Sequence, residues 1–220
     1  MVRSLAGLGL AAVIAGRALG CIEVIPLRPE LRGAAVAHDA MGMADEIEEL
    51  IDRQVDTPRD RKQAYEAVRD WKEKSAAYAY ARASLAGRLA EIEGLMAPGL
   101  IADMERWARI SVALDPRFRD GAARRMLGTL YVLAPASLVK FGDSEEGLEL
   151  LEKQLERYPK NPTNHLRLAE GYIALGDPEP AFELLCHTLV RGDSLRPSEK
   201  RLRDTLVGQV GGTAALECGE

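Results

Sequence analysis

Apolar residues recur at helical spacing along most of the chain, and the clearest example is the segment of residues 161–191. Leu168, Ala169 and Tyr172 fall on one face of a predicted first helix. Gly176 and Pro178 then end that helix and start the next, because glycine adopts the left-handed conformation after a helix and proline suits a first helical position. The inner face of the second helix carries small and apolar residues: Ala181, Leu184, Leu185 and Thr188 or Leu189. The segment therefore predicts a helix–turn–helix hairpin.

The same pattern occurs twice more upstream, as Leu127-Gly128-x-x-Tyr131 and as Leu85-Ala86-x-x-Leu89. This spacing, followed by an Ala-containing or Gly-containing second helix, is typical of tetratricopeptide repeats. We expect repeats at about residues 79–116, 121–159 and 162–193, and a capping helix at 197–209. Ser144 is the expected N-cap of the second helix of the middle repeat. The sequence predicts an all-α protein, a tetratricopeptide-like α-solenoid of antiparallel helix hairpins with an N-terminal signal segment.

The segments around these repeats complete the predicted domain organisation. Residues 21–37 contain two prolines and are expected to form an extended tether, and residues 210–220 a flexible tail. The helical domain then covers residues 38–209, with a short amphipathic helix near 38–54 and a long helical stretch in two pieces at 59–93. Two insertions, at residues 91–100 and 132–143, lengthen their repeats beyond the usual period of about 34 residues, and such insertions fall on one face of a solenoid.

The first 20 residues indicate a signal peptide of the lipoprotein type. Arg3 precedes an apolar run that is too short to span a bilayer. The run leads to Ala18-Leu19-Gly20-Cys21, which is similar to a bacterial lipobox and predicts lipidation of Cys21. Ordinary signal cleavage near Gly20, or an uncleaved anchor, are the alternatives. A lipid anchor at Cys21 would hold the protein to a membrane in the bacterial periplasm. Of the two membranes, the outer membrane is the expected one.

Charge and cysteine content exclude some classes of function. The net charge of −5 does not suggest the basic surface of a nucleic-acid-binding protein, so a nucleic acid is not expected as a partner. Three cysteines are too few for a disulfide framework, and no pair has metal-ligand spacing. Whether Cys186 and Cys218 form a disulfide stays open, because the tail was expected to be loose and Cys186 could simply be buried.

Several short motifs resemble a known family. They are Ala113-Leu114-Asp115-Pro116, Leu127-Gly128-x-x-Tyr131, Ala134-Pro135, Phe141-Gly142-Asp143, Leu168-Ala169-Glu170 and Phe182-Glu183-Leu184-Leu185. With them, residues 104–189 resemble the T component associated with tripartite ATP-independent periplasmic (TRAP) transporters. The resemblance implies a periplasmic lipoprotein with cryptic tetratricopeptide repeats. It also implies a protein partner, a periplasmic solute-binding protein, and uptake of organic acids or hydrophobic ligands.

We find no catalytic constellation in the sequence. His38, His165 and His187 are interpreted as packed or surface residues, and the Glu-rich stretch of Glu46, Glu48 and Glu49 as a solvated helix face. Neither a cofactor nor a metal ion is expected, and the protein is expected not to be an enzyme; an enzyme on a helical scaffold is the least favoured class.

Trp107, Tyr131 and Tyr172 are the candidate residues of a groove that binds a partner or a small apolar ligand. The alternative interpretation places Tyr131 and Tyr172 in the core between helices. The expected function is assistance of small-molecule uptake by a TRAP transporter. The second hypothesis is a general tetratricopeptide scaffold for protein assembly in the cell envelope.

Overall fold

The computed structural model describes residues 26–94, 97–216 and 218 of the chain. The predicted signal segment and the lipidation site at Cys21 lie outside these residues. Among the described residues every regular element is a helix. None of these helices combines the length and apolarity needed to cross a membrane.

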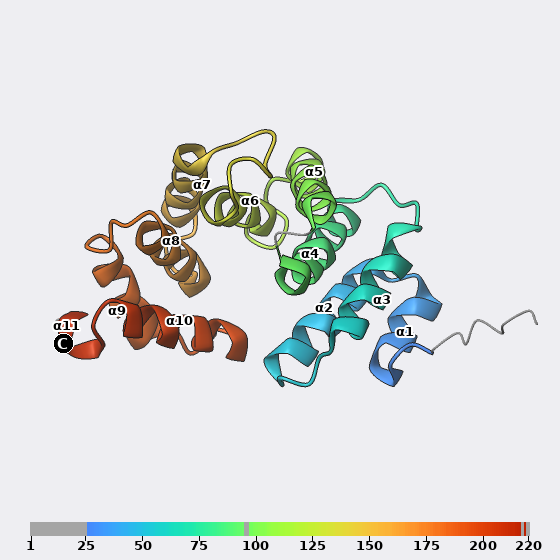
Figure 1. Cartoon of the computed structure of the whole chain (residues 1–220), viewed down its shortest axis with the longest axis horizontal. Helices are drawn as coiled ribbons and strands as arrows, with labels where there is room; N and C mark the ends of the chain where they lie inside the picture. The colour runs from blue at the N-terminus through green and yellow to red at the C-terminus, as the bar shows by residue number, and fades with distance from the viewer. Residues whose placement is uncertain (1–25, 95–96, 217, 219–220) are drawn as a thin grey trace, which may run out of the picture.

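The helices follow one another in a single order along the chain (Figure 1). They are α1 (Pro29–Ala37), α2 (Ala40–Asp52), α3 (Pro58–Arg69), α4 (Ala76–Glu93), α5 (Pro98–Leu114), α6 (Ala122–Leu133), α7 (Ser144–Arg157), α8 (Pro162–Ala174), α9 (Ala181–Arg191), α10 (Pro197–Gln209) and α11 (Thr213–Leu216).

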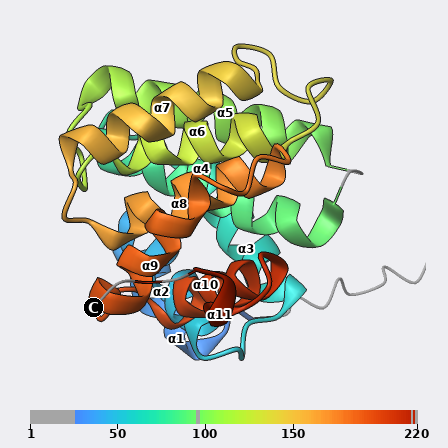
Figure 2. The ribbon, with the colours of Figure 1, turned by 90° about the vertical axis from the view of Figure 1, so that its left-hand side faces the viewer.

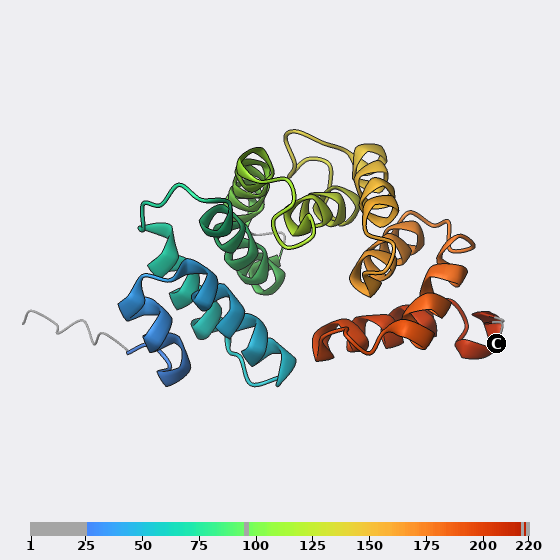
Figure 3. The ribbon, with the colours of Figure 1, turned by 180° about the vertical axis from the view of Figure 1, so that it is seen from behind.

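Neighbouring helices pack in pairs, and the pairs follow an arc. The most extensive packing joins α4 with α5, α6 with α7, and α8 with α9, which are the three helix pairs predicted from the sequence. The arc is seen face-on in Figure 1 and from behind in Figure 3. Figure 2 shows it from its C-terminal end, with α9, α10 and α11 nearest the viewer. The all-α class and the repeat-like pairing are therefore confirmed.

A close approach of two glycines explains the Leu-Gly motif in the middle pair. A Cβ atom at Gly128 of α6 would lie 2.9 Å from the carbonyl oxygen of Gly147 of α7. A Cβ atom at Gly147 would lie 2.9 Å from the carbonyl oxygen of Gly128. Since such contacts are shorter than any side chain tolerates, the two backbones are as near to each other as glycine permits.

The cap of α7 differs from the prediction by one residue. Asp143, and not Ser144, accepts a hydrogen bond from the Glu146 N–H at 2.9 Å. Asp143 has an extended backbone, which is the conformation of an N-cap, whereas Ser144 is already the first helical residue. The first turn still carries Glu145 and Glu146, whose negative charges interact favourably with the positive end of the helix dipole.

The predicted extended tether at residues 21–37 is wrong for its second half, where α1 forms. Pro29 stands at the first helical position, where its missing N–H costs nothing. Leu31 is fully buried in a core shared with α2, α3 and α4. Arg28 fixes the start of the helix by donating to the Val55 carbonyl at 2.6 Å and to Asp60 at 3.1 Å. Tertiary contacts thus order a segment whose prolines suggested an extended chain.

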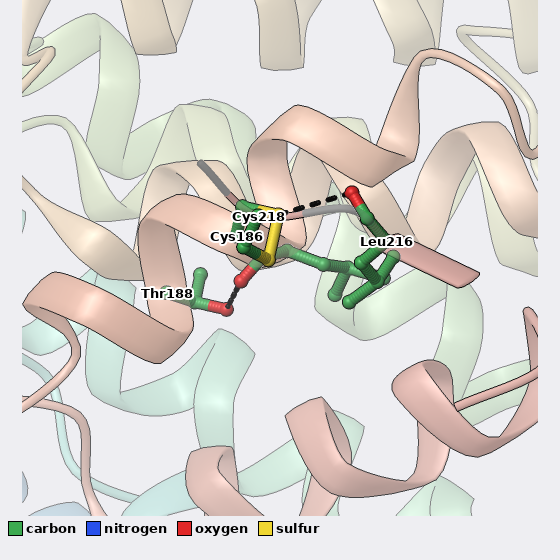
Figure 4. The surroundings of a disulfide bond; sticks show 5 residues. Cys186, Thr188, Leu216 and Cys218 are labelled. Atoms are coloured by element: carbon green, nitrogen blue, oxygen red, sulfur yellow. Dashed lines mark hydrogen bonds between the residues drawn. A yellow bond between two sulfur atoms is a disulfide. The ribbon is translucent and has the colours of Figure 1, made fainter. Parts of the chain in front are cut away.

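The predicted flexible tail at residues 210–220 is also wrong for its described part. Residues 213–216 form α11, and Leu216 is buried in the core of α8, α9 and α10. A disulfide joins Cys186 of α9 to Cys218, and the Cys186 sulfur also contacts the Leu216 carbonyl at 3.5 Å (Figure 4). The tail is ordered because this cross-link and the burial of Leu216 hold it against α9.

The two ends of the arc meet where α2 ends and α10 begins, as Figures 1 and 3 both show. Asp52, the last residue of α2, accepts from Arg196 Nε at 2.6 Å and from the Ser198 N–H at 2.9 Å. In return, Arg201 of α10 donates to the carbonyls of Ile51 at 2.8 Å and Asp52 at 3.1 Å. We call these contacts the Asp52 clasp. Each helix satisfies free backbone groups at the end of the other, and the arc becomes a closed ring.

Candidate functional site

The ring surrounds a cavity of about 860 Å³, which is open to solvent. Most of its lining comes from the even-numbered helices α2, α4, α6, α8 and α10, together with the turns before α6, α8 and α10. The volume lies within the range of small-molecule sites, which is roughly 300–1,000 Å³. The cavity is therefore the strongest candidate for a binding site in the described part of the chain.

Helix α2 carries a row of carboxylates, of which Asp45 and Glu48 line the cavity, and each carboxylate of the row pairs with an arginine from another segment. Asp45, Glu48 and Asp52 are spaced i, i+3, i+7, which places them on one helix face. Asp45 forms two hydrogen bonds to Arg119, at 2.8 and 2.6 Å. Glu48 forms two to Arg88, at 2.6 and 2.8 Å. With the Asp52 clasp, the row joins α2 to α4, to the turn before α6 and to α10.

These ion pairs differ in how much they stabilise the ring. The Asp45–Arg119 pair is nearly half exposed on both sides, so solvent screening limits it to about 1 kcal/mol or less. The Glu48–Arg88 pair is more enclosed. Burial alone would lower the pKa of Arg88, but Glu48 and Glu91 outweigh burial and raise it, so the guanidinium stays charged. The acidic wall is thus already neutralised by the protein itself.

The opposite wall, on α6, presents polar groups with fewer partners. Arg125 donates from Nη1 to the Asn164 Oδ1 at 2.8 Å, and no described carboxylate forms an ion pair with it. Thr129 lies one turn further along α6, and its Oγ1 is buried without a hydrogen-bond partner in the described structure. Tyr80 of α4 also lines the cavity, and burial raises the pKa of its phenol.

The predicted groove residues lie in the core and not in the cavity lining. Tyr131 is buried between α5 and α6, where burial raises its pKa to about 12. Tyr172 is partly buried and donates to Glu152 at 2.6 Å. Trp107 packs edge-on against Tyr78, with ring centroids 5.5 Å apart, and donates from its indole N–H to Asp103 at 3.1 Å. The interpretation of Tyr131 and Tyr172 as core residues is the one that agrees with these positions.

Two of the three histidines, which the sequence left scattered, meet in space. His165 of α8 and His187 of α9 stack with ring centroids 3.5 Å apart, and each Nδ1 is buried without a hydrogen-bond partner in the described structure. His38 stacks on Trp71 at 5.0 Å. Burial lowers the pKa of both His165 and His187. Among the described residues no group of three His, Cys, Asp or Glu side chains is placed to hold a metal ion.

Sequence reasoning missed the acidic row on α2. Glu48 was interpreted as part of a solvated face, yet its side chain is only 13% exposed because Arg88 covers it. The i, i+3, i+7 spacing of Asp45, Glu48 and Asp52 was a visible signal. It did not reveal the arginine partners, which come from positions 40, 74 and 144 residues away along the chain.

Comparison of the chain with protein families and with curated proteins found no match.

Proposed function

We propose that the protein is a non-enzymatic, tetratricopeptide-like lipoprotein of the bacterial periplasm that holds a small molecule in its central cavity and passes it to or from a protein partner. The partner would be a periplasmic solute-binding protein of a TRAP-type uptake system, and Cys21 would carry the lipid anchor. The proposal combines the sequence motifs with the geometry of the cavity.

One observation carries the small-molecule part: the ring of even-numbered helices encloses a cavity of about 860 Å³. A solenoid that serves only as a scaffold needs a curved surface, but it does not need its two ends joined. Here the Asp52 clasp joins residues 144 and 146 positions apart. Closure costs chain entropy and is stable because charged and backbone groups pair, so the enclosed space is a defined feature of the fold.

The nature of the lining changes the expected ligand. The sequence suggested a groove for a partner or a small apolar ligand, but arginine, aspartate and glutamate side chains line much of the cavity. Apolar side chains line the rest, among them Met104, Met126 and Pro162. A ligand with both polar and apolar portions fits this lining better than a purely apolar one.

The test uses the full-length protein expressed with its own signal in its native host. Cross-linking, detergent solubilisation and mass spectrometry identify the partners, and the intact mass reports acylation. The matched control is Cys21→Ser, which removes the thiol and should move the protein from the membrane fraction to the soluble fraction. Native mass spectrometry of the same preparation reports any retained small molecule.

Two results would support the proposal: recovery of a solute-binding protein or transporter subunit, and a small molecule that is retained by the protein. Recovery of envelope-assembly proteins without any transport component would contradict it and favour the general scaffold. An unmodified Cys21, with equal membrane partition of the wild type and Cys21→Ser, would refute the lipid anchor alone.

A further inference from the structure

The guanidinium groups around the cavity fall into two kinds. Most are paired with a carboxylate of the same protein: Arg88 with Glu48, Arg119 with Asp45, Arg196 with Asp52 and Arg167 with Glu170, at 2.6–2.8 Å. Arg125 differs, because its described polar partner is the neutral side-chain amide of Asn164. In a carboxylate–guanidinium pair the charge of the arginine is balanced, whereas Arg125 keeps an unbalanced positive charge and free N–H donors beside the cavity.

The guanidinium of Arg125 is partly desolvated by the residues around it. The side chain is half-buried, and burial lowers its pKa, while Arg167 acts in the same direction. Tyr80, Glu199 and Asp120 act in the opposite direction, but neither carboxylate pairs with the guanidinium. A partly desolvated cation without an anionic partner costs free energy. An anionic ligand in the cavity would supply the missing negative charge, and perturbed charged groups of this kind cluster at functional sites.

Thr129 gives a second, independent observation. It lies four residues after Arg125 on α6, so the two side chains share one helix face. A threonine within a helix usually directs its hydroxyl to the carbonyl four residues earlier. Here the Oγ1 atom is buried and forms no hydrogen bond in the described structure. Thr129 lines the cavity, so its unpaired hydroxyl lies buried just behind the cavity wall, one turn from the unpaired guanidinium.

We propose that Arg125 and Thr129 form a binding site for the oxyanion group of the cavity ligand, which is a carboxylate or a phosphate. This inference rests on the proposed function, because it names the chemistry of the molecule that the cavity holds. The guanidinium offers two parallel N–H groups that match two oxygens of either anion. The Thr129 hydroxyl, which has no partner in the described structure, donates to one of these oxygens once its side chain turns toward the ligand. Met104 and Met126 face the rest of the ligand.

The experiment compares ligands that share a body and differ in charge. The probes are hexanoate and hexyl phosphate, with hexanamide and hexanol as neutral counterparts, and titration calorimetry measures their affinities. We expect the wild type to bind one of the two anions at least tenfold more tightly than its neutral counterpart. Since a hydrogen bond to a charged group corresponds to roughly tenfold to a hundredfold in affinity, Arg125→Gln should lose about that factor for the anion only.

Thr129→Val and Arg124→Gln complete the design. Valine keeps the shape of threonine and removes the unpaired hydroxyl, so we expect a higher melting temperature without ligand and weaker anion binding. A purely structural threonine would not give this opposite pair of changes. Arg124 is the preceding residue of α6 and lies outside the cavity lining, so Arg124→Gln should leave the anion affinity unchanged.

The outcomes separate this inference from the proposed function. Neutral and charged probes that bind equally, or an anion affinity that Arg125→Gln and Thr129→Val leave unchanged, would overturn the oxyanion site while the cavity remained a binding site. Binding of none of the four probes would also overturn it. A small molecule retained equally by wild type and Arg125→Gln in native mass spectrometry would then still support the proposed function.

Discussion

The Asp52 clasp gives the most direct test of the ring, and the perturbation is Asp52→Ala. Asp52 is only 8% exposed although it is charged. Its position at the C-terminal end of α2 is unfavourable by itself, because a carboxylate there faces the negative end of the helix dipole. The same carboxylate also lies at the N-terminus of α10, where its interaction with the helix dipole is favourable. Arg196 precedes α10 and has no side-chain acceptor, so Asp52 supplies the cap from a distant part of the chain.

The expected loss of stability follows from these contacts. Removal of an N-cap acceptor costs about 1 kcal/mol, within a range of about 0.5–2. The lost bond to Arg196 adds about 1 kcal/mol and not more, because the arginine side chain is 38% exposed and screened by solvent. We therefore expect a decrease of about 2 kcal/mol in the free energy of unfolding. With a slope of about 2 kcal/mol per molar, the midpoint in urea should fall by about 1 M.

The assay is equilibrium unfolding in urea, followed by circular dichroism, for the wild type and two variants. The control is Asp70→Ala, whose carboxyl is 78% exposed and should change stability by less than about 0.5 kcal/mol. If Asp52→Ala behaved like this control, the carboxylate would not hold α10 in solution. The reasoning that closes the ring through Asp52 would then be refuted.

The pH dependence of the same difference is a second check. Burial raises the pKa of Asp52, but the hydrogen bonds from Ser198 and Arg196 outweigh it, so the pKa is lowered on folding. The unfolded value is about 3.9. Since the folded pKa lies below the unfolded one, the contribution is complete above that value and is lost as pH falls through the folded pKa. The difference between wild type and Asp52→Ala should therefore be constant near pH 7 and shrink below about pH 4.

The other predictions concern the α6–α7 and α8–α9 pairs and the tail. Gly128→Ala should destabilise the protein by about 1–3 kcal/mol in urea unfolding, because the new Cβ would contact the α7 backbone; an unchanged midpoint would contradict the close approach. Reduction of the Cys186–Cys218 disulfide, 32 residues apart in sequence, should lower stability by about 2–4 kcal/mol. Non-reducing peptide mapping checks the bond, and free thiols in the oxidised protein would refute it. The lowered pKa values of His165 and His187 mean that neutral rings are favoured on folding, so their contribution is present above the unfolded pKa of about 6.5 and declines as pH falls below it. His187→Phe should reduce the loss of melting temperature between pH 7 and pH 5, and an equal loss in both proteins would exclude the stacked pair as its cause.

Much of the fold could be predicted from local patterns. The bounds of α10 agree with the sequence prediction, because proline at a first helical position and apolar residues at helical spacing act within a few residues. The Leu127-Gly128 motif correctly marked the first helix of a pair, and the structure adds that Gly128 is where the two helices of this pair come closest. The two errors, at α1 and at the tail, have one cause. Leu31 and Leu216 become buried against partners far away in sequence, and no local pattern reports those partners.

The candidate site could be predicted only in part. The sequence directed attention to Trp107, Tyr131 and Tyr172, since large aromatics often anchor ligands. In the structure Tyr131 lies in the core and the other two pack against core clusters, while charged residues that a sequence reader assigns to solvent line much of the cavity. The consecutive residues Arg124 and Arg125 illustrate the limit. Only the second lines the cavity, and that follows from the direction of α6 relative to α8.

The sequence by itself therefore determined the helices of the three repeats and their pairing along the chain, because hydrogen bonds and apolar spacing within a hairpin are local. Only the tertiary structure decided that the arc closes into a ring, that Asp45 and Glu48 of α2 line the cavity and that Arg125 stands without an anionic partner in the described structure. Those features depend on the small rotation from each helix pair to the next, which accumulates along the arc and brings Asp52 to Arg196 across 144 residues of chain.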